Sequence, residues 1–198
     1  MLLTNLRGKT PPAVLLLLLL SIIYFFINYL GDPTKQDISR NNDFSILSTY
    51  TITDRSETLE QILAHKSLFV PSLVEDLPWS FDQQAYWLHL IIRNNSNKSA
   101  ELVSHFDNSM LDEMDIYQLK PTGAVVKHLR LGDQYEISPI QRFNPHFRFN
   151  AAANSESHLY IRIATTGISN TPIQIYERVN FDRLVEKTHL LWGVFIGV

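Results

Sequence analysis

Side chains that can stack on a small molecule and hydrogen-bond to it recur at alternate positions of several short segments. In residues 86–93, 158–164 and 172–176, aliphatic residues alternate with aromatic, histidine, arginine and amide residues. An extended strand points successive side chains to opposite faces, so each segment is expected to have one apolar and one chemically active face. The active faces carry Trp87, His89, Arg93, Tyr160, Arg162, Gln174 and Tyr176.

If the aliphatic faces build the core, the active faces coincide and form a candidate ligand-binding surface. Aromatic rings stack on the apolar faces of a sugar or another small polar ligand, while donors between them fix hydroxyls or carboxylates. Arg162 has the geometry for a bidentate contact to a carboxylate. The alternative interpretation is that Trp87 and Tyr160 pack beneath a loop or the 56–65 helix. In that case Arg93 and Arg162 are ordinary solvated or ion-paired residues.

Other chemistry has less support in the sequence. The chain has no cysteine, which excludes disulfides, thiolate metal sites and cysteine nucleophiles. Its seven histidines show neither H-x-H nor H-x-x-x-H spacing, so no metal or other cofactor is expected. In a strand, Glu113 and Asp115 would share a face about 7 Å apart. That spacing resembles the catalytic carboxylate pair of a glycosidase, but two such carboxylates more often lie on a solvated strand edge. The chain is therefore not expected to be an enzyme.

The charge distribution separates the N-terminal segment from the rest. Residues 1–30 contain Arg7 and Lys9 and no acid, so the other residues carry 15 basic and 20 acidic side chains. A mildly acidic body argues against a nucleic-acid partner, which would require a basic surface. With 45% hydrophobic and 19% charged residues, the chain has enough apolar material for a folded core.

Residues 13–30 read AVLLLLLLSIIYFFINYL and contain no charge. As a helix they would extend about 27 Å, close to the thickness of the hydrocarbon core of a bilayer. Basic residues before the segment predict a cytoplasmic N-terminus and an exported body. Residues 1–30 are therefore expected to be a signal anchor or a signal peptide. The length of the run and the lack of an Ala-x-Ala site favour the anchor. The polar residues 31–43 are expected to be a linker.

The other end of the chain is also apolar, since residues 190–198 read LLWGVFIGV. A polar segment leading into an apolar run with tryptophan is typical of a transmembrane helix entering from the interface. Residues 183–198 are therefore expected to be the start of a transmembrane helix, with further membrane segments after it. The alternative is a C-terminal strand or core helix.

Residues 44–182 are expected to form one β-rich domain. Beyond the three alternating segments, candidate strands are 101–106, 113–119, 125–131 and 145–150, separated by turn-forming clusters such as Pro121-Thr122-Gly123 and Gly132-Asp133. A short helix is expected near 56–65 from the spacing of Leu59, Ile62 and Leu63. About six or seven short strands without alternating helices predict a mainly β fold, an antiparallel β-sandwich.

The same segments resemble a known family in their order and spacing. The string YWLHLIIRNNSNKSAELVSHFDNSMLDEMDIYQLKPTG is similar to the core of the second type of extracellular sensor domain of bacterial seven-transmembrane receptors with diverse intracellular signalling modules. The resemblance covers residues 44–198. Its successive parts are a tryptophan-bearing strand ending in Asn94, LDEMDIY at 111–117, Gly132-Asp133, Arg142, the Phe147 strand, LYIRIAT, PIQIYE and an apolar helix near Leu190.

The resemblance implies a jelly-roll-like domain outside a bacterial inner (cell) membrane, in the periplasmic or extracellular space. It also implies a following seven-helix bundle and a cytoplasmic output module such as a diguanylate cyclase or histidine kinase. The expected partners are the lipid bilayer, an unidentified small polar ligand and a second receptor copy in a homodimer. The alternative function is a membrane-anchored exported carbohydrate-binding or adhesion domain without signalling output.

Overall fold

In the computed structural model the chain forms two compact units, Met1–Pro33 and Thr34–Val198. The structure describes residues 12–14, 16–18, 20, 21, 24, 37, 38, 41–72, 84–135, 141, 145–166 and 172–196. The described residues of the first unit are helical. Much of the predicted leader and parts of the predicted linker lie outside these residues. No helix in the described ranges has both the length and the apolar character needed to cross a bilayer.

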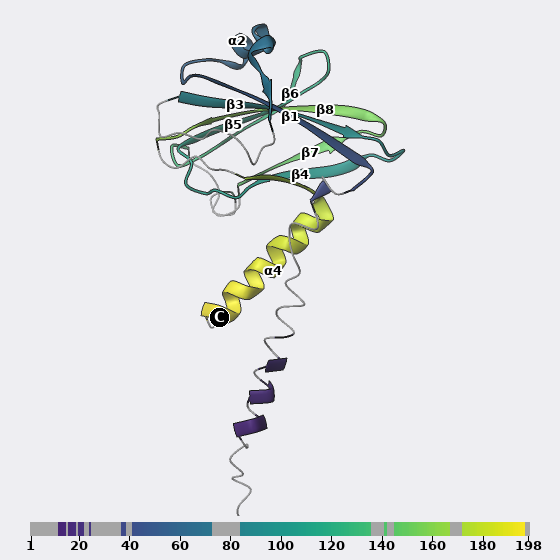
Figure 1. Ribbon diagram of the computed structural model, residues 1–198, viewed down its shortest axis with the longest axis vertical. Coiled ribbons are helices and arrows are strands. Elements are labelled where there is room, and N and C mark those ends of the chain that lie inside the picture. The colour runs from purple at the N-terminus through teal and green to yellow at the C-terminus, as the bar shows by residue number, and fades with distance from the viewer. Residues whose placement is uncertain are drawn as a thin grey trace, which may run out of the picture. The chain divides into compact units, whose positions relative to one another are not determined.

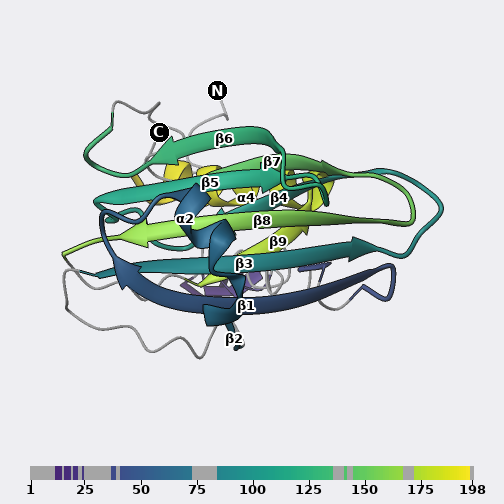
Figure 2. The same ribbon diagram turned by 90° about the horizontal axis from the view of Figure 1, so that it is seen from above.

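The second unit is mainly β and its strands pair antiparallel. This confirms the mainly β, antiparallel part of the predicted fold class. The described strands form a six-stranded sheet in the order β2-β1-β3-β8-β5-β6 and a three-stranded sheet in the order β7-β4-β9. Figure 1 shows the sheets as two layers, and Figure 2 looks down onto the six-stranded sheet. The strands are β1 (Phe44–Asp54), β2 (Val70–Pro71), β3 (Gln84–Asn94), β4 (Ala100–Phe106), β5 (Glu113–Leu119), β6 (Val125–Leu131), β7 (His146–Ala151), β8 (Ser155–Ala164) and β9 (Ile173–Glu177).

The main core contains the aliphatic faces that the alternation predicts. Even-numbered residues of β3, such as Leu88 and Leu90, and odd-numbered residues of β8, such as Ile161, are buried there. The three-stranded sheet contributes Leu102 and Phe147 to the same core. Because strand side chains alternate, the odd-numbered residues of β3 and the even-numbered residues of β8 face away from this core.

A short helix, α2 (Leu59–Ala64), covers part of that outward face. Its N-cap is Thr58, whose hydroxyl accepts from the Gln61 backbone, while the Gln61 side chain accepts from the Thr58 backbone. This capping box satisfies backbone donors at the helix start. Leu59 and Ile62 are buried against Trp87 and other side chains of the outward face. A 3₁₀ turn, η3 (Lys66–Leu68), follows α2.

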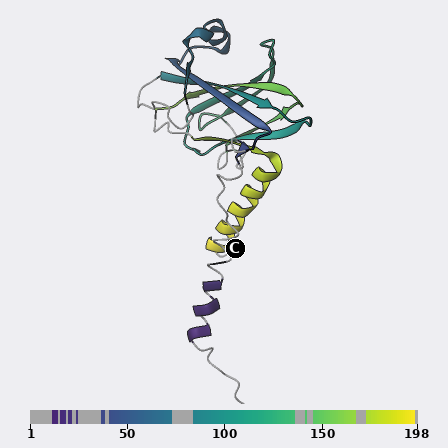
Figure 3. The ribbon, with the colours of Figure 1, turned by 45° about the vertical axis from the view of Figure 1, so that its right-hand side comes forward.

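The C-terminal helix α4 (Arg178–Ile196) begins immediately after β9. Phe181 is buried with Val103 and Tyr176, and Leu184 packs against them. These contacts seat the first turns of α4 on the outward face of the three-stranded sheet. Figures 1 and 3 show α2 and α4 on opposite sides of the two sheets.

Candidate functional site

The structure brings together five of the seven predicted site residues. In the β3–β8 pairing, Trp87 lies opposite Arg162, His89 opposite Tyr160, and Arg93 opposite Glu156. Trp87, His89, Arg93, Tyr160 and Arg162 therefore share the outward face of the six-stranded sheet.

Gln174 and Tyr176 do not join the other five, so the expectation that all the active faces coincide is wrong for β9. This strand pairs with β4 in the other sheet, and its outward face lies across the core from that of β3. Tyr176 is fully buried beside Phe181 of α4, and its hydroxyl donates to Gln174 Oε1 at 2.5 Å. These two residues belong to the junction with α4.

The aromatic side chains of the outward face are largely covered. Trp87 is 0% and Tyr160 2% exposed, and both pack with α2. The rings of His89 and Tyr160 stack with centroids 4.1 Å apart. Trp87 Nε1 is buried and has no hydrogen-bond partner within the described part of the chain. This is the alternative packing that the sequence left open, and it leaves no open stacking surface at Trp87 or Tyr160.

Two histidines lie side by side next to this aromatic cluster. His89 Nε2 and His158 Nδ1 are 3.0 Å apart, so one ring donates a hydrogen bond to the other. Burial, with smaller contributions from the nearby His158 and Lys66, lowers the pKa of His89 to about 4. Burial also lowers the pKa of His158, while Glu156 opposes that change. Both rings are therefore neutral near pH 7, which allows the hydrogen bond between them.

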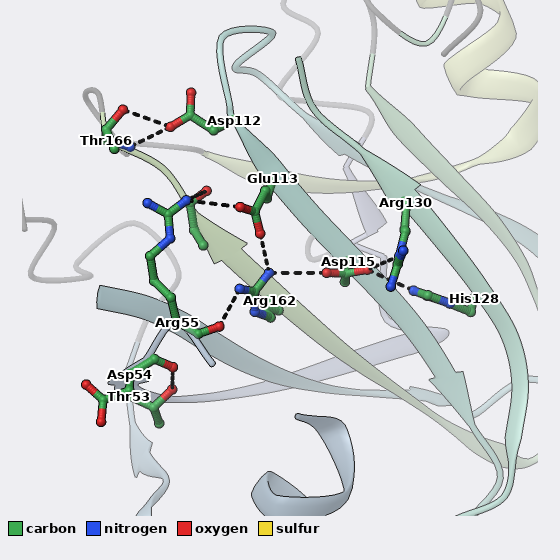
Figure 4. Close-up of polar contacts among 11 residues, drawn as sticks. Thr53, Asp54, Arg55, Asp112, Glu113, Asp115, His128, Arg130, Arg162 and Thr166 are labelled. Carbon is green, nitrogen blue, oxygen red and sulfur yellow. Dashed lines mark hydrogen bonds and ion pairs between the residues drawn. The ribbon is translucent and has the colours of Figure 1, made fainter. Parts of the chain in front are cut away.

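Arg162 lies at the centre of a charged network at one end of the same face (Figure 4). Its guanidinium donates to Glu113 Oε2 at 3.0 Å, to Asp115 Oδ2 at 3.3 Å and to the Arg55 carbonyl at 2.6 Å. Arg55 in turn pairs with Glu113 at 3.2 Å. Because these partners engage the Arg162 guanidinium, it is not available for the bidentate ligand contact predicted from the sequence.

Asp115 completes this network from β5. Its Oδ1 accepts hydrogen bonds from His128 Nε2 at 2.9 Å and Arg130 Nε at 3.1 Å, both from β6. Glu113 and Asp115 share a face, as their spacing predicts, and Arg162 lies between them. The pair therefore serves as an anchor for a buried cation. Within the described residues, no group of three or more potential ligands is placed to hold a metal ion.

A cavity of about 350 Å³ lies away from all the predicted site residues. Its lining comes from β4, β5, β6 and β7, at the side where the edge strands β6 and β7 approach each other. It includes Glu101, Gln118, Lys127, Arg148 and Asn150, with Phe149 as an apolar member. Sequence reasoning missed this cavity because its polar residues lie singly on several strands and form no motif.

Two residues that line the cavity also hold the first turn of α4. Arg148 Nη2 pairs with Asp182 Oδ1 at 3.3 Å, and Glu101 Oε2 pairs with Arg178 Nη1 at 3.0 Å. Arg178 and Asp182 are themselves joined along the helix at 3.3 Å. The cavity and the start of α4 are thus connected by a continuous chain of four charged side chains.

Comparison with known proteins gives one family and several distant structures. No curated protein matches the chain. The GH31 alpha-xylosidase from Xanthomonas citri is 9% identical with a TM-score of 0.36, over 74% of this chain and 16% of that one. Tailspike protein 4 of bacteriophage CBA120 is 10% identical with a TM-score of 0.23, over 74% and 20%. Procruciferin, an 11S globulin of Brassica napus, is 9% identical with a TM-score of 0.17, over 73% and 30%.

The chain thus spans less than a third of each of these proteins. The family model described as 7TMR-DISM extracellular 2 matches residues 44–177, from the start of β1 to the end of β9. Arg142, a part of the resemblance seen in the sequence, lies outside the described residues. The match confirms that resemblance and covers more than half of the chain, which therefore belongs to the family of extracellular sensor domains of 7TMR-DISM membrane receptors.

Proposed function

We propose that residues 44–177 bind a small polar ligand outside a bacterial inner membrane and transmit its presence through α4. In this proposal the domain has the jelly-roll-like sandwich fold that its family implies. Residues 13–30 anchor the chain in the bilayer, and a seven-helix bundle with a cytoplasmic cyclase or kinase follows α4. The body faces the periplasmic or extracellular space.

The observation that supports transmission is the direct connection between the sensor body and α4. Glu177 ends β9 and Arg178 begins α4, so no loop separates them. Phe181 is 1% exposed in its apolar cluster, and the pairs Arg148–Asp182 and Glu101–Arg178 flank it. A change at β4 or β7 therefore acts directly on the first turn of α4. A ligand that prefers one arrangement shifts the population of that arrangement.

The location of the body is tested by cysteine accessibility, because the chain has no native cysteine. Thr122, at an exposed turn between β5 and β6, is replaced in Thr122→Cys, and Thr4→Cys is the matched control at the N-terminus. A membrane-impermeant maleimide applied to intact spheroplasts should label Thr122→Cys. The same reagent should label Thr4→Cys only after lysis. Labelling of Thr122→Cys only after lysis would place the body in the cytoplasm and refute the proposal.

Transmission is tested separately in the membrane-embedded receptor. Spin labels at Thr122→Cys and Glu186→Cys report the distance between the sensor body and α4. Replacing both Arg148 and Arg178 by glutamine removes the ion pairs at the start of the helix and should change the distance distribution. An Arg93→Gln variant on the outward face of the six-stranded sheet is the control and should preserve it. Identical distributions in all variants would argue against α4 as the transmitting element.

A further inference from the structure

We infer that the cavity between β6 and β7 binds a small hydroxylated carboxylate, such as a sugar acid, which competes with α4 for Arg148. The inference deepens the proposed function, since it assigns a site and a ligand class to the same sensor. It moves the ligand away from the aromatic face predicted from the sequence, which α2 covers.

Lys127 is the feature that selects a carboxylate. Its ammonium donates to the Arg148 carbonyl at 2.7 Å and lies 5.0 Å from the centre of the Phe147 ring. It has no ion-pair partner among the described residues, although it is exposed at the cavity. Arg148 supplies a second cation from β7, an edge strand of the other sheet. A carboxylate bound between them would gain charge-assisted hydrogen bonds from both.

The remainder of the lining suits hydroxyl groups. Gln118 and Asn150 carry amides that donate and accept, and Glu101 provides an acceptor. Gln118 Nε2 donates weakly to the Asn150 carbonyl at 3.4 Å, a bond that a ligand hydroxyl can replace. Phe149 and Val126 add apolar surface. A volume of about 350 Å³ falls at the lower end of the range for small-molecule sites and suits one sugar-sized ligand.

Occupancy of the cavity is coupled to α4 through Arg148. The pair between Arg148 and Asp182 has side chains that are 43% and 40% exposed, and the pair between Arg178 and Glu101 is similarly exposed. Exposed pairs of this kind contribute little to stability, so a ligand carboxylate can draw Arg148 away from Asp182. By linkage, a ligand that releases α4 must bind more tightly when α4 is already released.

Binding is tested by isothermal titration of the full chain in detergent micelles, with D-galacturonate as the probe and D-galactose as its uncharged counterpart. Galacturonate should bind, and galactose should bind at least about tenfold more weakly because it lacks the carboxylate. Lys127→Gln should weaken galacturonate binding by about tenfold, whereas Lys127→Arg should retain most of the affinity. The control Arg93→Gln should bind as the wild type does. Circular dichroism checks that each variant is folded.

Coupling is tested with Asp182→Asn, which frees Arg148 from α4 without changing the cavity lining. This variant should bind galacturonate about threefold more tightly than the wild type. Spin labels at Thr122→Cys and Glu186→Cys should report a change in distance on addition of galacturonate but not of galactose. Unchanged affinity in Asp182→Asn refutes the competition.

The absence of galacturonate binding, or equal binding of galactose, refutes the site. Neither result affects the proposed location of the body or the proposed transmission through α4, which are tested by the maleimide labelling and by the ligand-free distance measurements.

Discussion

Replacing Arg162 by methionine should lower the free energy of unfolding by about 3 kcal/mol. The guanidinium has three partners, and the side chains of Arg162 and Asp115 are only 11% and 6% exposed. Its removal leaves the Arg55 carbonyl without this donor, at a cost of about 1 kcal/mol. It also leaves two carboxylates together without the cation between them. Asp115 retains Arg130 and His128, which keeps the total at the lower end of the range for a broken buried pair.

Urea unfolding of the full chain in detergent, followed by tryptophan fluorescence, measures this loss because the buried Trp87 lies next to Arg162 in the sheet. The matched control is Arg93→Met on the same face. Arg93 pairs with Glu156, and their side chains are 60% and 35% exposed, so its loss should cost less than about 1 kcal/mol. Equal losses in the two variants would contradict the view that burial makes the Arg162 network a structural anchor.

Three further perturbations test other parts of the domain. His89 has a pKa of about 4 in the folded state and an ordinary value of 6.5, so unfolding takes up a proton between these values and stability falls as pH is lowered from about 6.5 to 4. His89→Phe should flatten the profile of melting temperature against pH between these values. An unchanged profile would contradict the lowered pKa of His89, and His65→Phe, at an exposed position, is the control. Thr58→Ala removes the capping box of α2 and should lower the free energy of unfolding, measured in urea, by about 1 kcal/mol. Thr58→Ser keeps the hydroxyl and should retain most of this stability. Phe181→Ala removes a buried ring at the junction and should lower the free energy of unfolding by about 3 kcal/mol. Backbone amide hydrogen exchange in the first turns of α4 should become about 100-fold faster, and unchanged exchange would show that Phe181 does not hold the helix.

The strands could be predicted where one face is wholly aliphatic. β3 and β8 extend the predicted segments by a few residues, because Leu88, Leu90, Ile161 and their neighbours mark the core. β5 and β6 have no wholly aliphatic face, but they have the predicted bounds because turn-forming clusters at 121–123 and 132–133 end them. β1 was not predicted, although it is 11 residues long. Its sequence FSILSTYTITD alternates, with Phe44, Ile46, Tyr50 and Ile52 on the core face, but Ser48 interrupts that face and Leu47 lies on the other. Threonine favours strands through its branched side chain, and the pairing of β1 with β3 supplies the remaining stabilisation.

The candidate site was less predictable because it depends on which strands become neighbours. Alternation assigns Tyr176 and Trp87 each to an outward face, but only the sheet order shows that these faces belong to different layers. The two-residue spacing of Glu113 and Asp115 predicted their shared face, whereas Arg162 comes between them through the β5–β8 register. Lys127 and Arg148 carry no signal in the sequence that connects them, since their proximity arises from two edge strands in separate sheets.

The two sets of ion pairs in the domain differ in what their rearrangement would cost. Arg162 and Asp115 at the centre of the network are buried and each has several partners, so moving one side chain leaves others uncompensated. The pairs that hold α4 are exposed, and water can replace either partner when it moves. A sensor needs a rigid body and a contact that a ligand of modest affinity can alter. The Arg162 network meets the first requirement, and the pair between Arg148 and Asp182 meets the second because one of its members also lines the cavity.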